Sequence, residues 1–347
     1  MTAAIDAADA TGRPLRRPGP RYALPTVPRQ RHTATVVIPC YRYGKYLPEA
    51  VRCALAQRHV DMRVVIVDDC SPDDSLTIAR SLAAEDSRVE VVAHETNLGH
   101  IQTYNDGLAR VDTEFVALVS ADDLVAPGAI DRAVALMERF PDVGLVYGKL
   151  VPFSDAVPRS RQWRGLWNVW TGRQWIESVA RNGFNPIISP EAVLRTSALR
   201  EAGEYNGDLP HSGDLEYWLR VAALWDVGQV RGVVQANYRV HGANMHLTRF
   251  PGSIADIEQK MAAFDVLSSP QVSRGRRWVM DARASAARTL SAEALACAGR
   301  EQQAGDLGKA RDLARLAAIL APIGVARGVS DGQAGVTRFR EPRGSDV

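Results

Sequence analysis

Two adjacent carboxylates, Asp122 and Asp123, stand directly after an apolar run at 115–119. A run of this length predicts a buried strand, and Pro127 followed by Gly128 indicates that a helix begins just beyond. Two like charges side by side repel each other, and a divalent cation offsets that repulsion, since Mg²⁺ is commonly held by one or two carboxylates together with phosphate oxygens. The alternative is that both residues only cap the following helix, where acidic groups favour the positive end of the helix dipole.

Two further polar loops follow apolar runs upstream. Residues 39–42 (Pro-Cys-Tyr-Arg) follow the β-branched run at 35–38, and Asp68 with Asp69 follow the run at 62–67. Because the carboxyl ends of parallel strands meet at one edge of a sheet, we expect all three loops to lie together. One nucleotide-plus-metal site would use all three, whereas three unrelated helix caps would be a coincidence.

The elements that must position these loops alternate between strand and helix. The strand patterns lie at 35–39, 62–67, 89–92, 115–119 and 143–147, and the helical patterns lie at 46–57, 75–84, 101–110 and 130–140. This rhythm predicts an α/β fold with a mixed, mainly parallel sheet flanked by helices. No strand is followed by G-x-G-x-x-G, and no G-x-x-x-x-G-K-[ST] occurs, which argues against a dinucleotide fold or a P-loop.

Composition narrows the class of protein. The chain has 347 residues, of which 46% are hydrophobic and 24% charged, and this fits one large globular domain with appendages, or two domains. A net charge of +2 gives no general attraction to nucleic acid, so we expect no nucleic-acid partner. The four cysteines lack C-x-x-C spacing and predict buried thiols in a reducing compartment. With no apolar run of spanning length, we expect a cytoplasmic protein.

Four motifs in order resemble the successive signatures of family 2 glycosyltransferases, which have the GT-A fold. They are the first loop with its flanks (35–47), the Ile-Val-Asp-Asp-Cys-Ser-Pro-Asp stretch (66–73), Asn-Leu-Gly (97–99) with Asn105, and Ala-Asp-Asp (121–123). The resemblance covers residues 33–243 and implies a nucleotide-sugar donor, a divalent cation (Mn or Mg) and inversion at the anomeric carbon. Two positions depart from the family: Arg42 stands where Asn is common, and Ser120 where an additional Asp is common.

Carried over residue by residue, the resemblance implies a donor site. Pro39 and Tyr41 would lie beside the nucleobase, and Asp69 would accept a hydrogen bond from the base. Asp122 would face the ribose or the metal, and Asp123 would ligate the metal that bridges the two phosphates. The residues alone allow plainer roles, with Tyr41 as a core aromatic residue and Asp69 as a turn former.

A second chemical stretch surrounds Asp214. Gly213 and Asp214 precede apolar residues at helical spacing, which puts Asp214 near a helix N-terminus and makes a plain N-cap the alternative. The resemblance implies that Asp214 is the catalytic base that removes the proton of the acceptor hydroxyl. Gly213 replaces the usual acidic neighbour of that base, and Glu216 is a weaker candidate.

A third stretch carries Arg239 and His241 in an R-x-H-x-x-N pattern. It resembles the point where some members of the family supply a histidine to the metal, so His241 is a predicted metal ligand or diphosphate contact. Neutral imidazole suits Mn²⁺ better than Mg²⁺. Arg239 would neutralise the leaving diphosphate. A structural histidine is the alternative.

Four tryptophans, at 163, 167, 170 and 175, have little periodicity around them. They predict either a lid over the acceptor site or a small hydrophobic cluster under a long loop. A lipid-linked acceptor would require peripheral contact with a membrane, for which this stretch and the C-terminal helices are the candidates.

These observations predict a disordered tail (1–32), a GT-A domain (33–250), a C-terminal helical appendage (251–327) and a second tail (328–347). The predicted function is metal-dependent, inverting transfer of a sugar from a nucleoside diphosphate donor, UDP-sugar favoured, to an acceptor hydroxyl on a glycan, a lipid-linked intermediate or a small molecule. A sugar nucleotidyltransferase would carry a Gly-rich, basic N-terminal loop, which residues 39–44 do not resemble. A non-catalytic protein that binds sugar nucleotides stays open, because Ser120 and Gly213 replace family carboxylates.

Overall fold

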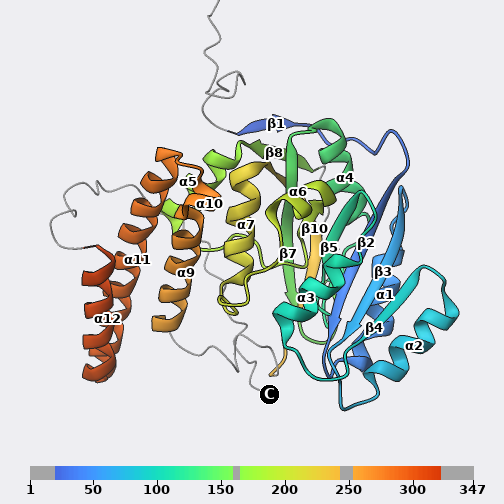
Figure 1. Cartoon of the computed structure of the whole chain (residues 1–347), viewed down its shortest axis with the longest axis horizontal. Coiled ribbons are helices and arrows are strands. Elements are labelled where there is room, and N and C mark those ends of the chain that lie inside the picture. The colour runs from blue at the N-terminus through green and yellow to red at the C-terminus, as the bar shows by residue number, and fades with distance from the viewer. Residues whose placement is uncertain (1–19, 159–164, 243–252, 322–347) are drawn as a thin grey trace, which may run out of the picture.

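The computed structural model describes residues 20–158, 165–242 and 253–321, and within them one ten-stranded sheet has the order β1-β8-β10-β7-β9-β5-β2-β3-β4, with β6 paired to β10 (Figure 1). The strands are β1 (Arg21–Ala23), β2 (His32–Cys40), β3 (Val60–Asp68), β4 (Val89–Ala93), β5 (Phe115–Leu118), β6 (Leu124–Val125), β7 (Val143–Phe153), β8 (Leu166–Trp170), β9 (Val193–Arg195) and β10 (Asp226–Arg239). The helices are α1 (Leu47–Leu55), α2 (Ser75–Glu85), α3 (His100–Ala109), α4 (Ala129–Arg139), α5 (Gly172–Asn182), α6 (Thr196–Ala202), α7 (Gly213–Leu224), α9 (Ser253–Ser268), α10 (Pro270–Ser273), α11 (Arg277–Ala304) and α12 (Leu307–Leu320), with a 3-10 turn η1 (Gly44–Tyr46) before α1.

One half of the sheet is parallel, as predicted. Strands β4, β3, β2 and β5 lie side by side in the same direction, and helices connect them. The centre of β2, residues 34–38, is buried throughout. Strands covered on both faces read as continuous apolar runs, and this is why the sequence pattern identified them. Their carboxyl ends bring the loops at 39–42, 68–69 and 119–123 to one edge.

The other half of the sheet is mixed. The short strand β9 lies antiparallel between β5 and β7, β7 is parallel to β10, and β10 is antiparallel to β8. The mixed α/β class is therefore confirmed. A register shift in β10 near Val230 and Val234 separates its first part, which pairs with β8, from its last part, which pairs with β6.

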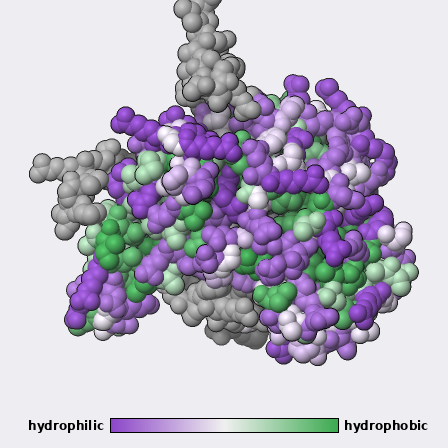
Figure 2. All heavy atoms as spheres, in the orientation of Figure 1, coloured by the Kyte–Doolittle hydropathy of each residue, from purple (hydrophilic) through white to green (hydrophobic). Residues whose placement is uncertain are grey.

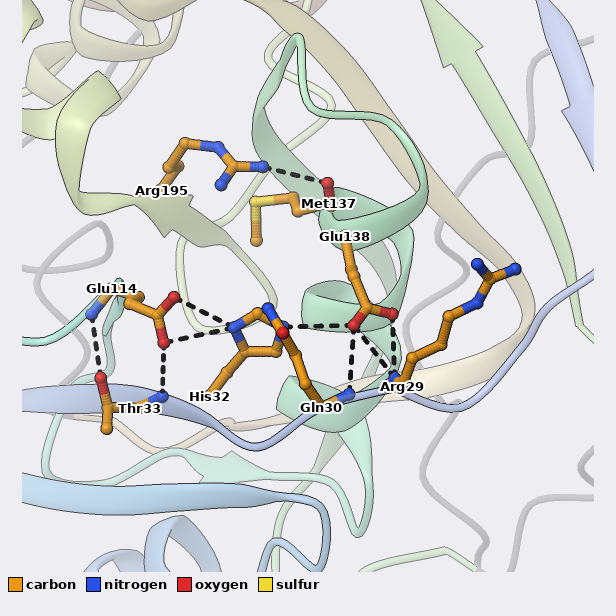
Figure 3. Close-up of polar contacts among 8 residues, drawn as sticks. All are labelled: Arg29, Gln30, His32, Thr33, Glu114, Met137, Glu138 and Arg195. Carbon is orange, nitrogen blue, oxygen red and sulfur yellow. Dashed lines mark hydrogen bonds and ion pairs between the residues drawn. The ribbon is translucent and has the colours of Figure 1, made fainter.

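The segment before β2 belongs to the fold, although the sequence predicts a tail for residues 1–32. Strand β1 pairs with β8, and α4 holds the crossing chain because the Glu138 carboxylate accepts the Arg29 N–H at 2.9 Å (Figure 3). His32 Nε2 lies 3.4 Å from Glu138 Oε1, and His32 Nδ1 lies 3.1 Å from Glu114 Oε1. These partners are about a hundred residues away, so a local pattern does not reveal them. Residues 1–19 of the predicted tail lie outside the described residues.

The C-terminal helices pack onto α5 and α7 rather than forming a separate unit. Helix α9 lies against α7, α11 lies against α5, and α12 packs on α11, on the opposite side of the view from β3 and β4 (Figure 1). Ile257, Phe264 and Leu267 of α9 are buried in the same apolar cluster as residues of the sheet and α7. The predicted appendage is thus helical, but it shares the core. Residues 251–252, 322–327 and the predicted second tail, 328–347, lie outside the described residues.

The tryptophans of the 163–175 stretch form core, not a lid, where the structure describes them. Trp167 in β8 and Trp175 in α5 are buried, and Trp175 Nε1–H donates to the Tyr147 hydroxyl at 3.4 Å. Trp170 is half-buried against the same cluster. Their large apolar rings are removed from water by the sheet and α5, which the local sequence does not show. Trp163 lies outside the described residues.

The surface mixes hydrophilic and hydrophobic side chains over the face seen in Figure 2. None of the helices in the described parts of the chain is long and apolar enough to cross a membrane. The four cysteines are free; Cys40 and Cys297 are buried as predicted, whereas Cys70 is exposed.

Candidate functional site

A cavity of about 460 Å³ opens at the edge of the sheet where β5 ends. It joins loops that lie far apart in the sequence and contains three carboxylates, those of Asp122, Asp123 and Asp214. Its lining consists of Tyr43, His100, Ile101, Tyr104, Ser120, Asp122, Asp123, Ile188, Ser189, Pro210, His211, Gly213, Asp214 and Tyr238. The cavity therefore brings the acidic loop after β5 together with the stretch around Asp214, and residues 39–42 and 68–69 are not part of its lining.

The turn after β5 is fixed on both sides. Val119 N–H donates to Val37 O of β2 at 2.9 Å, and Asp123 N–H donates to Ser120 O at 3.0 Å. The chain then forms β6, which pairs with the end of β10. The side chains of both aspartates consequently lie at the inner wall of the cavity, and both residues are buried.

Asp122 and Asp123 place two buried carboxylates side by side. Asp123 Oδ1 accepts the backbone N–H of Arg239 at 2.9 Å. Burial, followed by the charge of Asp122, raises the pKa of Asp123 well above its usual range. Such a pair fits a divalent cation, whose charge would stabilise both ionised carboxylates. The described residues hold no ready group of three His, Cys, Asp or Glu ligands, so a cation there would draw further ligands from a bound molecule or from water.

His241 is brought to this pair, as predicted. Its Nε2 lies 2.9 Å from Asp122 Oδ2. The ring is stacked on Tyr46 with centroids 5.9 Å apart and meets the edge of Tyr43 at 5.5 Å. Two aromatic neighbours thus fix the orientation of the imidazole toward the carboxylates.

Arg239 lies beside the acidic pair and is held by several contacts. Its Nε–H donates to Asp122 O at 3.0 Å, and its Nη2 pairs with the Glu49 carboxylate at 2.8 Å. The guanidinium lies 4.6 Å from the Tyr46 ring centroid and 4.4 Å from that of Phe153. The residue is only 7% exposed, and these contacts hold the Asp122–Asp123 turn; its contact with a diphosphate stays a prediction.

Asp69 serves the turn before α3. Its Oδ1 accepts Leu98 N–H at 2.7 Å and lies 2.9 Å from His94 Nδ1, while its Oδ2 accepts Gly99 N–H at 2.9 Å. The Asp69 carboxylate thus supports a turn about thirty residues away, whereas the local turn contact is made by its neighbour, because Asp68 Oδ2 accepts Ser71 N–H at 3.0 Å. Its neighbour Asp68 is buried, and Asp68 Oδ1 has no hydrogen-bond partner among the residues that the structure describes. Because Asp68 and Asp69 are adjacent and of the same residue type, the sequence alone does not show which of them makes which contacts.

The first loop carries an unusual backbone. Arg42 has φ +63°, in the left-handed region, and its N–H donates to Ser71 Oγ at 3.1 Å. Asn is enriched several-fold among non-glycine residues with positive φ, which accounts physically for Asn being common at this position. Tyr41 is 38% exposed and is therefore not a core aromatic residue, and Pro39 is half-buried at the end of β2.

Asp214 stands in the first turn of α7, as the helical spacing predicts. Ser212 occupies the N-cap position, and Asp214 Oδ2 accepts the Ser189 hydroxyl at 2.5 Å. Burial raises the pKa of Asp214 to about 6, while the hydrogen bond from Ser189 acts to lower it. The carboxylate is therefore mostly ionised at neutral pH.

Glu216 has surroundings that differ from those of Asp214. It is 1% exposed, its Oε1 and Oε2 accept hydrogen bonds from Arg220 at 2.5 and 2.9 Å, and it does not line the cavity. Side chains two residues apart on a helix point in different directions, so Glu216 does not share the face of Asp214. Register on the helix thus places Asp214 at the cavity and turns Glu216 away from it.

The sequence interpretation missed the wall opposite Asp214. Glu191 is buried, its Oε1 accepts Ile188 N–H at 2.8 Å, and burial raises its pKa to about 7. Ser189, two residues before Glu191, has a positive φ, and its hydroxyl donates a hydrogen bond to Asp214. The available signal was a lone glutamate within a mostly apolar stretch before β9, which is unusual for a residue type that is rarely buried.

Comparison with known proteins agrees with these features. Residues 35–201 match the model of the family described as "Glycosyl transferase family 2". An uncharacterized glycosyltransferase of Haemophilus influenzae is 22% identical over 218 residues, covering 60% of this chain and 65% of its own length. The glycosyltransferase GlyG of Streptococcus pneumoniae is 30% identical over 122 residues, covering 35% and 40%. The chain thus spans less than two thirds of the length of either relative.

Solved structures show the same fold. S. aureus TarS 1-349 in complex with UDP-GlcNAc has a TM-score of 0.56 at 16% identity, covering 82% of this chain and 90% of its own. A mannosyltransferase, PcManGT from Pyrobaculum calidifontis, in complex with GDP-Man and Mn²⁺, has a TM-score of 0.52 at 18% identity, covering 88% and 89%. At these identities the likeness concerns the fold alone.

Proposed function

We propose that this chain, which belongs to glycosyltransferase family 2 and has the GT-A fold, transfers a sugar from a nucleoside diphosphate donor to an acceptor hydroxyl with inversion at the anomeric carbon. The observation that carries the proposal is the cavity shared by Asp122, Asp123 and Asp214. One end of it has the charge to hold a cation, and the other end has a carboxylate suited to remove a proton. UDP-GlcNAc and GDP-Man in the structures with this fold support a nucleotide-sugar donor.

A divalent cation fits the acidic end of the cavity. Asp123 would ligate it, with His241 as a further ligand or a contact to the diphosphate, and Asp122 would face the cation or the ribose. When bound, the cation supplies positive charge to the diphosphate as it leaves. The imidazole of His241 favours Mn²⁺ over Mg²⁺. The Mn²⁺ bound to the mannosyltransferase with this fold supports a cation of this kind.

Asp214 acts as the base in a single displacement. The acceptor hydroxyl gives its proton to the Asp214 carboxylate while its oxygen forms a bond to the anomeric carbon. The bond between that carbon and the diphosphate oxygen breaks on the opposite face, and the nucleoside diphosphate leaves. A pKa of about 6 suits this task, because the group is ionised at neutral pH and still basic enough to take a proton.

The nucleotide end of the donor would lie toward the loops after β2 and β3. The half-buried Pro39 and the exposed ring of Tyr41 are available to a base. Asp69 would act by shaping the 94–99 turn, and its Oδ2, which accepts one backbone hydrogen bond, retains capacity for the predicted bond from the base. We favour uracil as the base and a UDP-sugar as the donor.

The test is turnover of a panel of UDP-, GDP- and dTDP-sugars with and without Mn²⁺, scored by mass spectrometry. Release of a nucleoside diphosphate that depends on the cation is the expected result. Release of pyrophosphate from a sugar phosphate and a nucleoside triphosphate would indicate a nucleotidyltransferase instead. Metal-enhanced binding without turnover against a broad acceptor panel would indicate a non-catalytic binding protein, and no metal-enhanced binding of UDP, GDP or dTDP would contradict the donor site itself.

A further inference from the structure

The wall of the cavity opposite the start of α7 touches the carboxylate that we propose as the base. Ile188 and Ser189 line the cavity, and the Ser189 hydroxyl donates to Asp214 Oδ2 at 2.5 Å. A hydrogen bond to an ionised acceptor is among the stronger side-chain contacts. The bond joins two segments that are twenty-five residues apart in the sequence.

The backbone at Ser189 is strained, and three hydrogen bonds maintain the strain. Its φ of +100° is one that residues with a Cβ rarely adopt. Ile187 N–H donates to Asn185 Oδ1 at 3.1 Å, Ile188 N–H to Glu191 Oε1 at 2.8 Å, and Ala192 N–H to Ser189 O at 2.9 Å. Strained residues persist where their surroundings over-determine them, and such residues cluster at functional sites.

We propose that Ser189 is a positioning residue for Asp214. Its hydroxyl holds Oδ2 in one orientation, leaves Oδ1 for the proton of the acceptor, and stabilises the ionised form of the carboxylate. Glu191 keeps the serine in place by holding the preceding peptide. The inference rests on the proposed function, because it assigns Ser189 a part in turnover that acts only through the base.

Other titratable groups lie close to Asp214. The carboxyl group of Glu191 faces it from the same wall, and Tyr104 and Tyr205 face it from α3 and from the loop before α7; the Asp214 charge contributes to the raised pKa of all three. Asp122, Asp123, His100 and His211 line the rest of the cavity. The Ser189 hydroxyl acts against burial, since it lowers the pKa of Asp214.

The experiment compares Ser189→Ala and Ser189→Gly with wild type. Alanine removes the hydroxyl, whereas glycine removes the hydroxyl and also relieves the positive φ. Ser212→Ala is the matched control, because Ser212 lies two residues from Asp214 and its side chain makes no capping hydrogen bond. Carbon-13 NMR of labelled aspartate gives the pKa of Asp214 in the protein alone, with Asp214→Asn to assign the signal. The pH profile of kcat is measured in parallel with UDP-glucose, UDP-GlcNAc and GDP-mannose, each with Mn²⁺.

We expect both serine variants to raise the pKa of Asp214 by about one unit, since a donor to the charged form is lost. The acid limb of kcat should move to higher pH by the same amount, and kcat on the plateau should fall about tenfold, because a misoriented base transfers the proton less well. The KM for the donor and the Ser212→Ala profile should stay unchanged.

An unchanged Asp214 pKa in both serine variants would overturn the proposal. So would a raised pKa with an unmoved acid limb, because Ser189 would then not act on turnover through this carboxylate. A glycine variant with the wild-type pKa, beside a shifted alanine variant, would also overturn it and assign the effect to backbone strain. A raised pKa in a protein that turns over none of these donors would support the contact and count against the proposed function.

Discussion

At the scale of single residues, the carboxylates of the cavity have different surroundings, which suit the two different tasks that we propose for them. Asp123 stands beside Asp122, and mutual repulsion within a buried turn favours a bound cation. Asp214 stands apart on α7, where burial leaves it with a pKa of about 6 and one hydroxyl donor. The same residue type can therefore serve as a ligand at one end of the cavity and as a base at the other.

The two tasks predict different kinetic effects. Asp123→Ala should weaken binding of the nucleotide sugar and abolish its dependence on Mn²⁺, because the diphosphate loses its counter-ion. Asp214→Asn should leave donor affinity nearly intact and lower turnover by about 10²- to 10⁴-fold, the usual effect of losing a positioned proton acceptor. Calorimetric titration with UDP and single-turnover kinetics separate these effects.

Equal loss of donor binding in the two variants would place Asp214 in the metal site or in the fold. Glu216→Gln serves as a matched control on the same helix, since Glu216 is paired with Arg220 away from the cavity. Loss of turnover in Glu216→Gln at normal stability, with activity retained in Asp214→Asn, would show that the base has been assigned to the wrong residue.

Glu191 predicts a pH dependence of stability. Burial raises its pKa in the folded protein to about 7, above the ordinary 4.5, so between these values the folded state binds more protons than the unfolded state. The free energy of unfolding contributed by this group is therefore greatest below pH 4.5 and falls as pH rises through 7. Glu191→Gln should remove about 1–3 kcal/mol of the decline between pH 5 and pH 8, measured by urea unfolding. The exposed Glu258→Gln should leave the wild-type slope, and an equal slope in Glu191→Gln would contradict the assignment.

At the scale of elements, helix α5 packs closely against α7, the helix that carries Asp214. Helix α5 begins at Thr171 with a capping box, in which Gln174 N–H donates to the Thr171 hydroxyl at 3.2 Å and Thr171 N–H donates to the Gln174 side chain at 3.0 Å. The next residue, Gly172, lies against the end of α7, the helix that carries Asp214. The cap and the glycine together fix how the two helices pack.

This packing predicts that adding one methyl group at Gly172 strongly destabilises the fold. A Cβ at Gly172 would lie 1.7 Å from Ala222 O and 2.4 Å from Trp225 O, both backbone atoms that cannot rotate away. Gly172→Ala should therefore lower the free energy of unfolding by about 2–3 kcal/mol or more, the upper range for overpacking. Gly207→Ala is the control, since a Cβ there meets no atom within 4 Å. Equal urea midpoints for the two variants would contradict the packing.

At the scale of the whole molecule, the C-terminal helices complete one face of the fold. Ile257, Phe264 and Leu267 of α9 are fully or almost fully buried, in a cluster that also contains Trp218 of α7. Figure 2 shows that apolar side chains also lie at the surface on the side of α11 and α12, where Leu295 is 56% exposed. Removal of these helices would expose a large part of the core to water.

A chain ending at residue 252 should therefore fail to fold cooperatively. We expect increased binding of a hydrophobic dye, loss of a sharp thermal transition and faster proteolysis, because the apolar face of α7 and α5 would be left uncovered. A chain ending at residue 327, where the sequence predicts a tail, should keep the full-length melting temperature. A cooperative transition in the shorter chain would show that the predicted division at residue 250 marks a domain that is stable by itself.

The sequence by itself determined the α/β class, the parallel half of the sheet and the meeting of three loops. Apolar runs of strand length, each ending in polar residues, carry that information locally. The Asp122–Asp123 pair was found this way, His241 and Asp214 were singled out by the family resemblance, and the structure brings all four residues together. Only the tertiary structure placed Asp214 but not Glu216 at the cavity, buried Arg239 between Tyr46 and Phe153, and set Ser189 and Glu191 against Asp214. These outcomes depend on helix register and on contacts between distant segments, which no local pattern encodes.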